Sequence, residues 1–151
     1  MRFLPLALLL AASCNKEDVT PPNIAANKQQ IWETIKAYHE AGDKPDVEIM
    51  ATYFAPEITI FKGAEDFVRG KDDCVRELVK RTKQYEGQNR ATILGREVIN
   101  ITGDVAVVTY VASVGTQRAA ITAVLRRTPE KKWLLSHLHE SWPPPSAPPT
   151  K

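Results

Sequence analysis

Four β-rich runs follow one another in the second half of the chain with only short turns between them. They span residues 90–101, 105–114, 117–127 and 133–141. Strand-forming runs joined by tight turns are typical of an antiparallel meander. Gly95 lies inside the first run and predicts a bulge at which the sheet bends. The second half of this chain is therefore predicted to form one curved antiparallel sheet.

Helical periodicity dominates the residues that precede this sheet. Asn27 and Gln30 have the spacing of a capping box, and Asp46 is a second candidate cap. Three helices are predicted. The first starts at about 23 or 27 and ends at 41, the second spans 47–54, and the third spans 71–85. A short strand is expected at 58–61 and an irregular connection at 62–69. Helices followed by a curved sheet define an α+β fold class.

The two cysteines lie in different surroundings. Cys74 falls on the apolar stripe of the third predicted helix, so it is expected to be a buried, unreactive thiol. Cys14 follows an apolar stretch of ten residues, 3–12, which is too short to span a bilayer but fits a signal-peptide core. The segment from Leu10 to Cys14 resembles a bacterial lipobox. That resemblance implies cleavage before Cys14 and a lipid on its thiol; the alternative is an ordinary secretory signal.

These features divide the chain into four parts. We predict a signal peptide at 1–13, a tether at 14–22, one domain at 23–142 and a proline-rich disordered tail at 143–151. Asn15 after the cysteine resembles an outer-membrane address. The predicted location is the cell envelope, lipid-anchored to the outer membrane and facing the periplasm; otherwise the protein is secreted to the periplasm.

Composition limits the kinds of partner. The chain is 43% hydrophobic and 25% charged, and its formal net charge is +2. A nucleic-acid-binding domain normally carries a marked basic excess. No nucleic-acid partner is therefore predicted.

The last β-rich run carries two histidines two residues apart. Regular strand alternation places His137 and His139 on one face with Trp133 and Leu135, and Glu140 on the other. The histidines could be hydrogen-bonded groups beside a cavity, or His139 could be a general base. A zinc pair would need His39 or Glu140 as a third ligand. His39 is better explained by its position at a helix C-terminus, so no metal and no cofactor are predicted.

Several short motifs occur in a characteristic order. They are Ala41-Gly42-Asp43, the segment 53–59, Arg69-Gly70-Lys71-Asp72, the hairpin 103–106 and the terminal Trp-x3-His-x-His-x-Ser of 133–141. Over residues 27–142 this order resembles the nuclear transport factor 2-like superfamily, with a closer likeness to SnoaL-like domains and to the association domain of calcium/calmodulin-dependent protein kinase II. The resemblance implies a cone in which a curved sheet wraps around helices and encloses a cavity.

Members of this superfamily include isomerases, dehydratases, cyclases and non-catalytic binding modules. The carboxylate base of the resembling ketosteroid isomerases falls on Lys62 here, and their tyrosine falls near Ile35. The anion-binding arginine of the kinase association domain falls on Thr122. Arg118 lies on the same strand face and could substitute, but a solvated strand end explains it better. Because the isomerase base and tyrosine are absent at these positions, catalysis of the isomerase design is not expected. Recognition of an anion by an arginine at position 122 does not carry over either.

The favoured hypothesis is a small-molecule-binding or interaction module with no assigned reaction. The alternatives are an enzyme of the SnoaL or ketosteroid isomerase type with His139 as general base, and a homo-oligomerisation module. The expected partners are an unknown small molecule and a second copy of the chain bound through the sheet. The predicted pocket-lining residues are Trp32, Tyr38, Phe61, Tyr110, His137 and His139.

Overall fold

The computed structural model describes residues 21–43, 46–62, 66–84, 91–114 and 117–141. The predicted signal peptide, most of the tether and the tail lie outside these ranges. The helices are α1 (Pro21–Asp43), α2 (Val47–Thr52) and α3 (Lys71–Gln84). The strands are β1 (Phe54–Lys62), β2 (Asp66–Arg69), β3 (Ala91–Thr102), β4 (Val105–Val114), β5 (Gln117–Arg127) and β6 (Trp133–Ser141).

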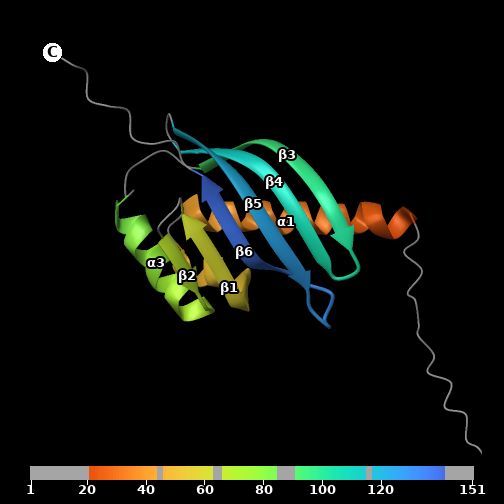
Figure 1. Ribbon diagram of the computed structural model, residues 1–151, viewed down its shortest axis with the longest axis horizontal. Coiled ribbons are helices and arrows are strands. Elements are labelled where there is room, and N and C mark those ends of the chain that lie inside the picture. The colour runs from red at the N-terminus through yellow and green to blue at the C-terminus, as the bar shows by residue number, and fades with distance from the viewer. Residues whose placement is uncertain (1–20, 44–45, 63–65, 85–90, 115–116, 142–151) are drawn as a thin grey trace, which may run out of the picture.

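The six strands form one curved sheet in the order β2-β1-β6-β5-β4-β3 (Figure 1). The predicted α+β class and the four-stranded meander from β3 to β6 are confirmed. The sheet as a whole is mixed, because β1 and β6 are parallel neighbours. The chain leaves β2 through α3 and enters the sheet again at the far edge. The meander then returns to β1, and β6 runs in the same direction as β1.

Several boundaries differ from the sequence prediction. The expected irregular connection contains β2, and α1 starts at Pro21, before the predicted domain start, so Asn27 lies inside the helix and does not cap it. β1 starts at Phe54 and contains Pro56, which has no N–H to donate to a neighbouring strand. The β1–β6 pairing shifts register between Phe54 and Thr59, and Pro56 lies in that interval. The irregularity lets an extended segment accommodate proline.

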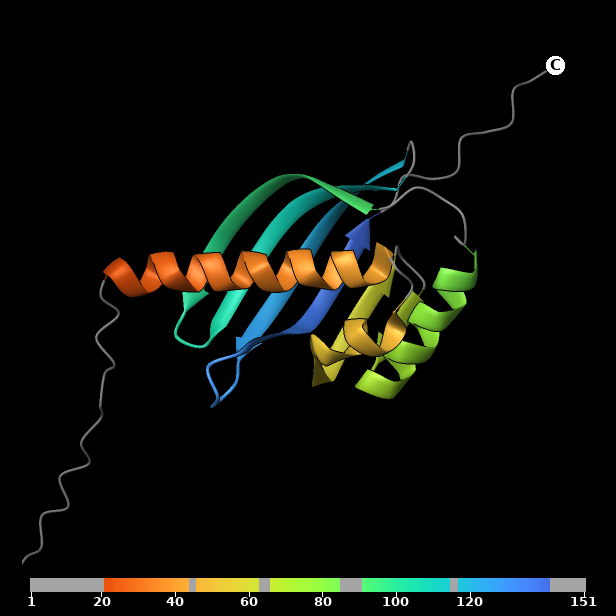
Figure 2. The same ribbon diagram turned by 180° about the vertical axis from the view of Figure 1, so that it is seen from behind.

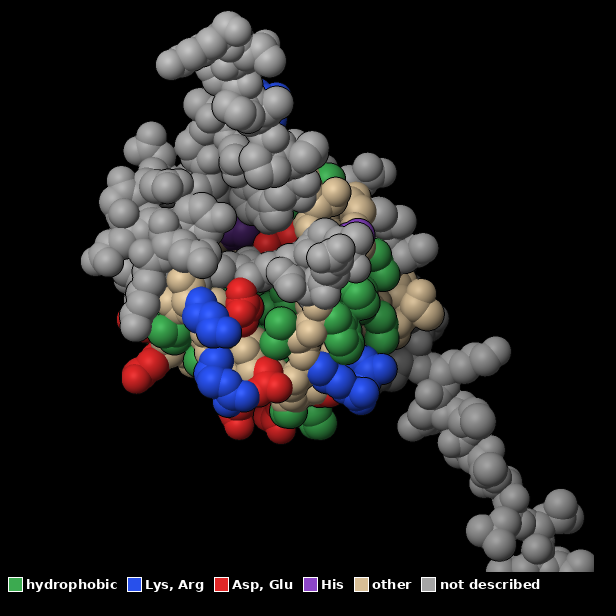
Figure 3. Space-filling view, turned by 60° about the vertical axis from the view of Figure 1, so that its left-hand side comes forward, with side chains coloured by type: hydrophobic (Ala, Val, Ile, Leu, Met, Phe, Trp, Pro, Cys, Tyr) green, Lys and Arg blue, Asp and Glu red, His purple; other side chains and the backbone are tan. Residues whose placement is uncertain are grey.

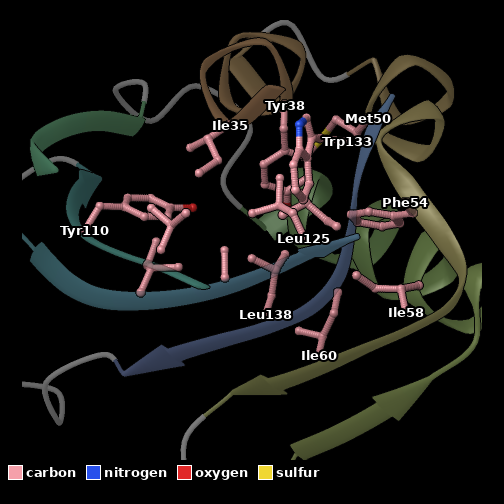
Figure 4. Close-up of a cluster of buried hydrophobic side chains, with 14 of the residues drawn as sticks. Ile35, Tyr38, Met50, Phe54, Ile58, Ile60, Tyr110, Leu125, Trp133 and Leu138 are labelled. Atoms are coloured by element: carbon pink, nitrogen blue, oxygen red, sulfur yellow. The ribbon is translucent and has the colours of Figure 1, made fainter. Parts of the chain in front are cut away.

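The helices cover the concave face of the sheet. Figure 2 shows α1 crossing in front of the strands, and α3 packs against β1 and β2. None of the described helices is long and apolar enough to cross a membrane. Figure 4 shows the resulting core, in which side chains from α1 and α2 meet those of the strands. Its largest fully buried members are Phe54, Ile31, Ile35, Ile58, Ile60, Leu125, Leu135, Leu138 and Val108.

A polar cluster around Arg127 fixes the start of α1 against the sheet. The Arg127 side chain donates from Nε to Asp104 Oδ1 at 2.7 Å and from Nη1 to Asn27 Oδ1 at 3.4 Å. Its guanidinium also lies 5.7 Å from the ring centroid of Trp133. Arg127 thus joins α1 to the ends of three strands. This contact ties the first part of α1 to that end of the sheet.

Besides an irregularity between Val98 and Asn100 in β3, two bulges change the direction in which side chains point. One follows Ile93 in β3, next to Gly95, as the sequence predicted. The other lies at Ser136 in β6, where Leu125 pairs with Leu135 but Val124 pairs with His137. The Ser136 hydroxyl donates to the carbonyl oxygen of Val124 at 3.2 Å. An extra residue in one strand reverses the alternation of side chains beyond it. Odd-numbered side chains before Ser136 and even-numbered side chains after it therefore point to the same face of the sheet.

Cys74 is fully buried, as the apolar stripe of α3 predicted. Burial, with smaller contributions from Asp73 and Glu77, raises the pKa of its thiol to about 11. At pH 8 roughly one molecule in a thousand would carry the reactive thiolate. In a Cys14→Ser chain, Cys74 is therefore expected to resist a thiol reagent until urea unfolds the protein. Fast labelling of the native chain would contradict this.

Candidate functional site

A tyrosine and a histidine are hydrogen-bonded inside the curve of the sheet. The hydroxyl oxygen of Tyr110 on β4 lies 2.9 Å from Nε2 of His39 near the end of α1. When the imidazole carries its proton on Nδ1, the tyrosine O–H donates to Nε2; in the other tautomer Nε2–H donates to the hydroxyl oxygen. Burial raises the pKa of Tyr110 well above 10, and the charges of Tyr38 and Glu140 raise it further. The phenol therefore keeps its proton at physiological pH.

Aromatic contacts from α1 hold this pair in place. Trp32 and His39 are seven residues apart, which puts them on one side of the helix two turns from each other. Their rings meet the Tyr110 ring edge to face, at centroid distances of 6.0 Å and 5.5 Å respectively. Tyr38 contacts both His39 at 5.2 Å and Phe54 at 5.6 Å. The Tyr110 ring is thus fixed from two turns of the helix.

A buried carboxyl group lies on the same face of the sheet. Tyr110 pairs with Ile121 on β5, and Ile121 pairs with Glu140 on β6, so the three residues form one row across the strands. Each of them is buried, and Glu140 is 6% exposed. Neighbouring strands are about 4.8 Å apart, which places Tyr110 and Glu140 on either side of Ile121 at roughly twice that spacing. The row combines a phenol and a carboxyl group within an apolar surface.

This row lies toward the end of the sheet where β6 and α1 both finish. Figure 3 looks onto that end of the molecule, where a histidine and acidic side chains are visible close together. Among the described residues, no group of three or more His, Cys, Asp and Glu side chains is placed to hold a metal ion. The arrangement can exchange protons and hydrogen bonds with a molecule that reaches these side chains.

The structure separates the six predicted pocket-lining residues into two sets. Trp32, Tyr38 and Tyr110 are buried on the concave side, against the core. Phe61, His137 and His139 lie on the opposite, outer face of the sheet, where Phe61 is 38% exposed and His139 is exposed. The bulge at Ser136 is the reason, because it turns both histidines away from the face that Trp133 and Leu135 share. The prediction that these three residues line the cavity is therefore corrected, and with it the candidate role of His139 as general base.

The positions that match functional residues of ketosteroid isomerases and of the kinase association domain lie in different parts of the structure. Ile35, at the isomerase tyrosine position, is fully buried in the core. Thr122 and Arg118 lie on the outer face of β5, so neither reaches the concave side. The backbone of Lys62, at the isomerase base position, pairs with Glu140; its side chain lies outside the described part of the chain.

Sequence reasoning missed two residues of this site. Glu140 was placed on the face away from the histidines, which is correct, but that face is the concave one. His39 was explained by its helix end alone. Its spacing from Trp32 and Ile35 puts it on the same apolar stripe of α1, and that signal was available in the sequence.

Residues 31–145 match the SnoaL-like domain family. The chain belongs to that family. The match covers most of the chain and includes every residue of the concave site. No curated protein matches the sequence.

Solved structures share the fold of this SnoaL-like domain. A candidate dehydratase of the NTF2-like family from Streptomyces avermitilis is 19% identical, with a TM-score of 0.69 over 80% of this chain and 99% of that one. A protein of unknown function from Nostoc punctiforme is 19% identical, with a TM-score of 0.70 over 82% and 96%. A candidate ketosteroid isomerase from Shewanella frigidimarina is 20% identical, with a TM-score of 0.67 over 76% and 97%. At this level of identity the likeness establishes the fold: a curved mixed sheet packed against helices.

His137 is expected to make the stability of this SnoaL-like domain depend on pH. Burial and the charge of His139 lower its pKa below the ordinary value of 6.5. The unfolded chain then binds the proton more tightly, so this contribution to stability is present above pH 6.5 and is lost as the pH falls through the folded pKa. In urea unfolding at pH 7.5 and 5.5, His137→Gln should lose less stability on acidification than the wild type. Equal losses would contradict the assignment.

Proposed function

We propose that this SnoaL-like domain binds a small organic molecule between α1 and the concave faces of β4, β5 and β6. The observation that carries the proposal is the hydrogen bond between Tyr110 and His39, together with the buried carboxyl group of Glu140 in the same cross-strand row as Tyr110. Small-molecule sites are concave and mostly apolar, with a few convergent polar groups. The concave side of this sheet has that composition.

The same residues indicate the chemistry of the ligand. Trp32 and Ile121 offer apolar surface, which suits a compact hydrocarbon or ring-containing body. The phenol of Tyr110 can donate or accept a hydrogen bond, because its raised pKa keeps it protonated. A ligand with an apolar body and at least one oxygen or nitrogen near the Tyr110 hydroxyl fits this surface.

A thermal-shift screen of small molecules, run in parallel on three proteins, tests the proposal. The proteins are the wild type, Glu140→Gln on the concave face and His139→Ala on the outer face. Hits should stabilise the wild type and His139→Ala equally and Glu140→Gln less. Hits that keep their effect in Glu140→Gln and lose it in His139→Ala would overturn the proposed site.

A second candidate function is general acid–base catalysis at the same site. The hydrogen bond between Tyr110 and His39 favours it, because an imidazole titrates near neutral pH and can move a proton to or from a bound substrate. The names of two structural relatives, a candidate dehydratase and a candidate ketosteroid isomerase, are compatible with proton-transfer chemistry. Catalysis would be supported if the wild type converts a hit from the screen and His39→Asn binds the same hit without converting it. If the wild type leaves every hit chemically unchanged, binding remains the function.

The proposal places this domain in the cell envelope, attached through lipid on Cys14. The lipobox-like segment Leu10–Cys14 supports this part of it. Cys14→Ser should move the protein from the membrane fraction to the soluble fraction of the producing bacterium. Membrane fractionation that does not change would contradict the lipid anchor.

The proposal also includes a homodimer formed through the outer face of β4 and β5. Val105 and Val111 are 37% and 38% exposed there, and Val107 is half-buried between them along β4. A row of exposed valines is suited to burial against a second copy. Light scattering should give a dimeric mass at micromolar concentration, and Val111→Lys should shift it towards the monomer. A monomeric wild type would contradict the dimer.

A further inference from the structure

The outer face of the sheet carries a second polar group that the concave site does not use. His137 and His139 project from β6 beyond the bulge at Ser136, on the side away from the core. On the neighbouring strand, Thr59 pairs with His137 and Phe61 pairs with His139. Side chains two apart on one face of a strand are close enough for two imidazoles to reach a common ion.

A hydrogen bond fixes the first of these imidazoles. The Thr59 hydroxyl oxygen lies 2.6 Å from Nδ1 of His137. When Nδ1–H donates to that oxygen, the lone pair of Nε2 is left for another ligand. Metal-binding histidines almost always use their second nitrogen in this way, because the hydrogen bond orients the ring and fixes its tautomer. In that tautomer, Thr59 holds His137 in the form that a metal ion requires.

An aromatic ring supports both histidines from the side. Phe61 lies 5.8 Å from the ring centroid of His137 and 6.3 Å from that of His139, in each case edge to face. Phe67 on β2 packs behind Phe61 at 4.6 Å. These contacts restrict the rotamers of both imidazoles, which lowers the entropy that ordering them costs.

We propose that His137 and His139 chelate one divalent late first-row transition ion, such as Ni²⁺, Cu²⁺ or Zn²⁺, through their ring nitrogens. Neither His39 nor Glu140, the third ligands that the sequence offers, can join this pair, because both lie on the concave side. On the outer face, within the described ranges, no third His, Cys, Asp or Glu completes the set. Water then fills the remaining positions. Imidazole ligands select these ions over Ca²⁺ and Mg²⁺, which prefer oxygen.

Calorimetric titration with NiCl₂ tests this site, using the full chain with Cys14→Ser and no histidine tag. The change at Cys14 removes a thiol that would compete for the ion. One Ni²⁺ per chain is expected, with affinity at least tenfold lower in His137→Gln and in His139→Gln. Thr59→Val removes the orienting hydroxyl at nearly constant shape and should weaken binding by about tenfold. His39→Gln, on the concave face, is the matched control and should bind as the wild type does.

Three results would overturn the chelate: no binding up to millimolar Ni²⁺, equal affinity in the wild type and the His137→Gln/His139→Gln double variant, or loss of binding in His39→Gln alone. Thermal unfolding without metal identifies any variant that fails to fold. For such a variant, His139→Asn serves instead, because residue 139 is exposed and tolerates substitution. The inference is independent of the ligand proposed for the concave side, so either can fail without the other.

Discussion

Leu138→Ala is expected to lower the free energy of unfolding by about 2–5 kcal/mol, since it removes a fully buried side chain from the centre of the core. Leu138 is 1% exposed, and its strand neighbours Ile60 and Ala123 are buried on the same face. The cavity would lie between β1 and β5, where the backbone hydrogen bonds of the sheet limit collapse. Urea unfolding followed by circular dichroism at pH 7 measures the loss.

Leu134→Ala is the matched control for this measurement. It deletes the same atoms from the same strand, but Leu134 is half-buried on the outer face, so a loss of about 1 kcal/mol or less is expected. Without the bulge at Ser136, residues 134 and 138 would share one face. Similar losses from the two substitutions would therefore contradict the change of face in β6.

Tyr110→Phe is expected to weaken the binding of a concave-site ligand by about ten- to a hundredfold. Removing one hydroxyl from a buried hydrogen-bonded site costs roughly 1–3 kcal/mol, and 1.4 kcal/mol corresponds to a factor of ten. The substitution keeps the ring that packs against Trp32 and His39, so the shape of the site is retained. Isothermal titration of a screening hit measures the change.

Tyr53→Phe provides the comparison for this variant. Tyr53 follows α2 and packs on the edge of the core, away from the Tyr110 row. It should bind the hit as the wild type does. Equal affinity of all three proteins would remove the Tyr110 hydroxyl from the site.

Much of the fold could be predicted because its signals are local. Runs of β-branched residues between glycine-containing turns define β3 to β5, and Asp46 caps α2 as predicted, accepting from the Ile49 N–H at 2.9 Å. The parallel contact of β1 with β6 pairs residues 78 to 81 positions apart in the chain, so no local pattern indicates it. β2 is short and pairs only with β1 among the described strands, which leaves it a weak periodic signal.

The site was predicted in part, and the error has one physical source. Tyr110 was identified correctly as an inward residue because β4 alternates regularly. In β6 the apolar positions shift parity between Leu135 and Leu138, three residues apart, which is the signature of an inserted residue. Leu134 masks that shift, because it makes the strand apolar on both faces. The histidines were consequently assigned to the wrong side, and the buried position of Glu140 was not recognised.

Nuclear magnetic resonance of the imidazole groups tests the central claim most directly, because the chain has only three histidines. The Cε1–H signals of His39, His137 and His139 can each be assigned from a single substitution in an untagged protein. A saturating hit from the ligand screen should shift the His39 signal and leave the other two in place. A hit that shifts His137 and His139 while His39 stays unchanged would place the ligand on the outer face and contradict the concave site.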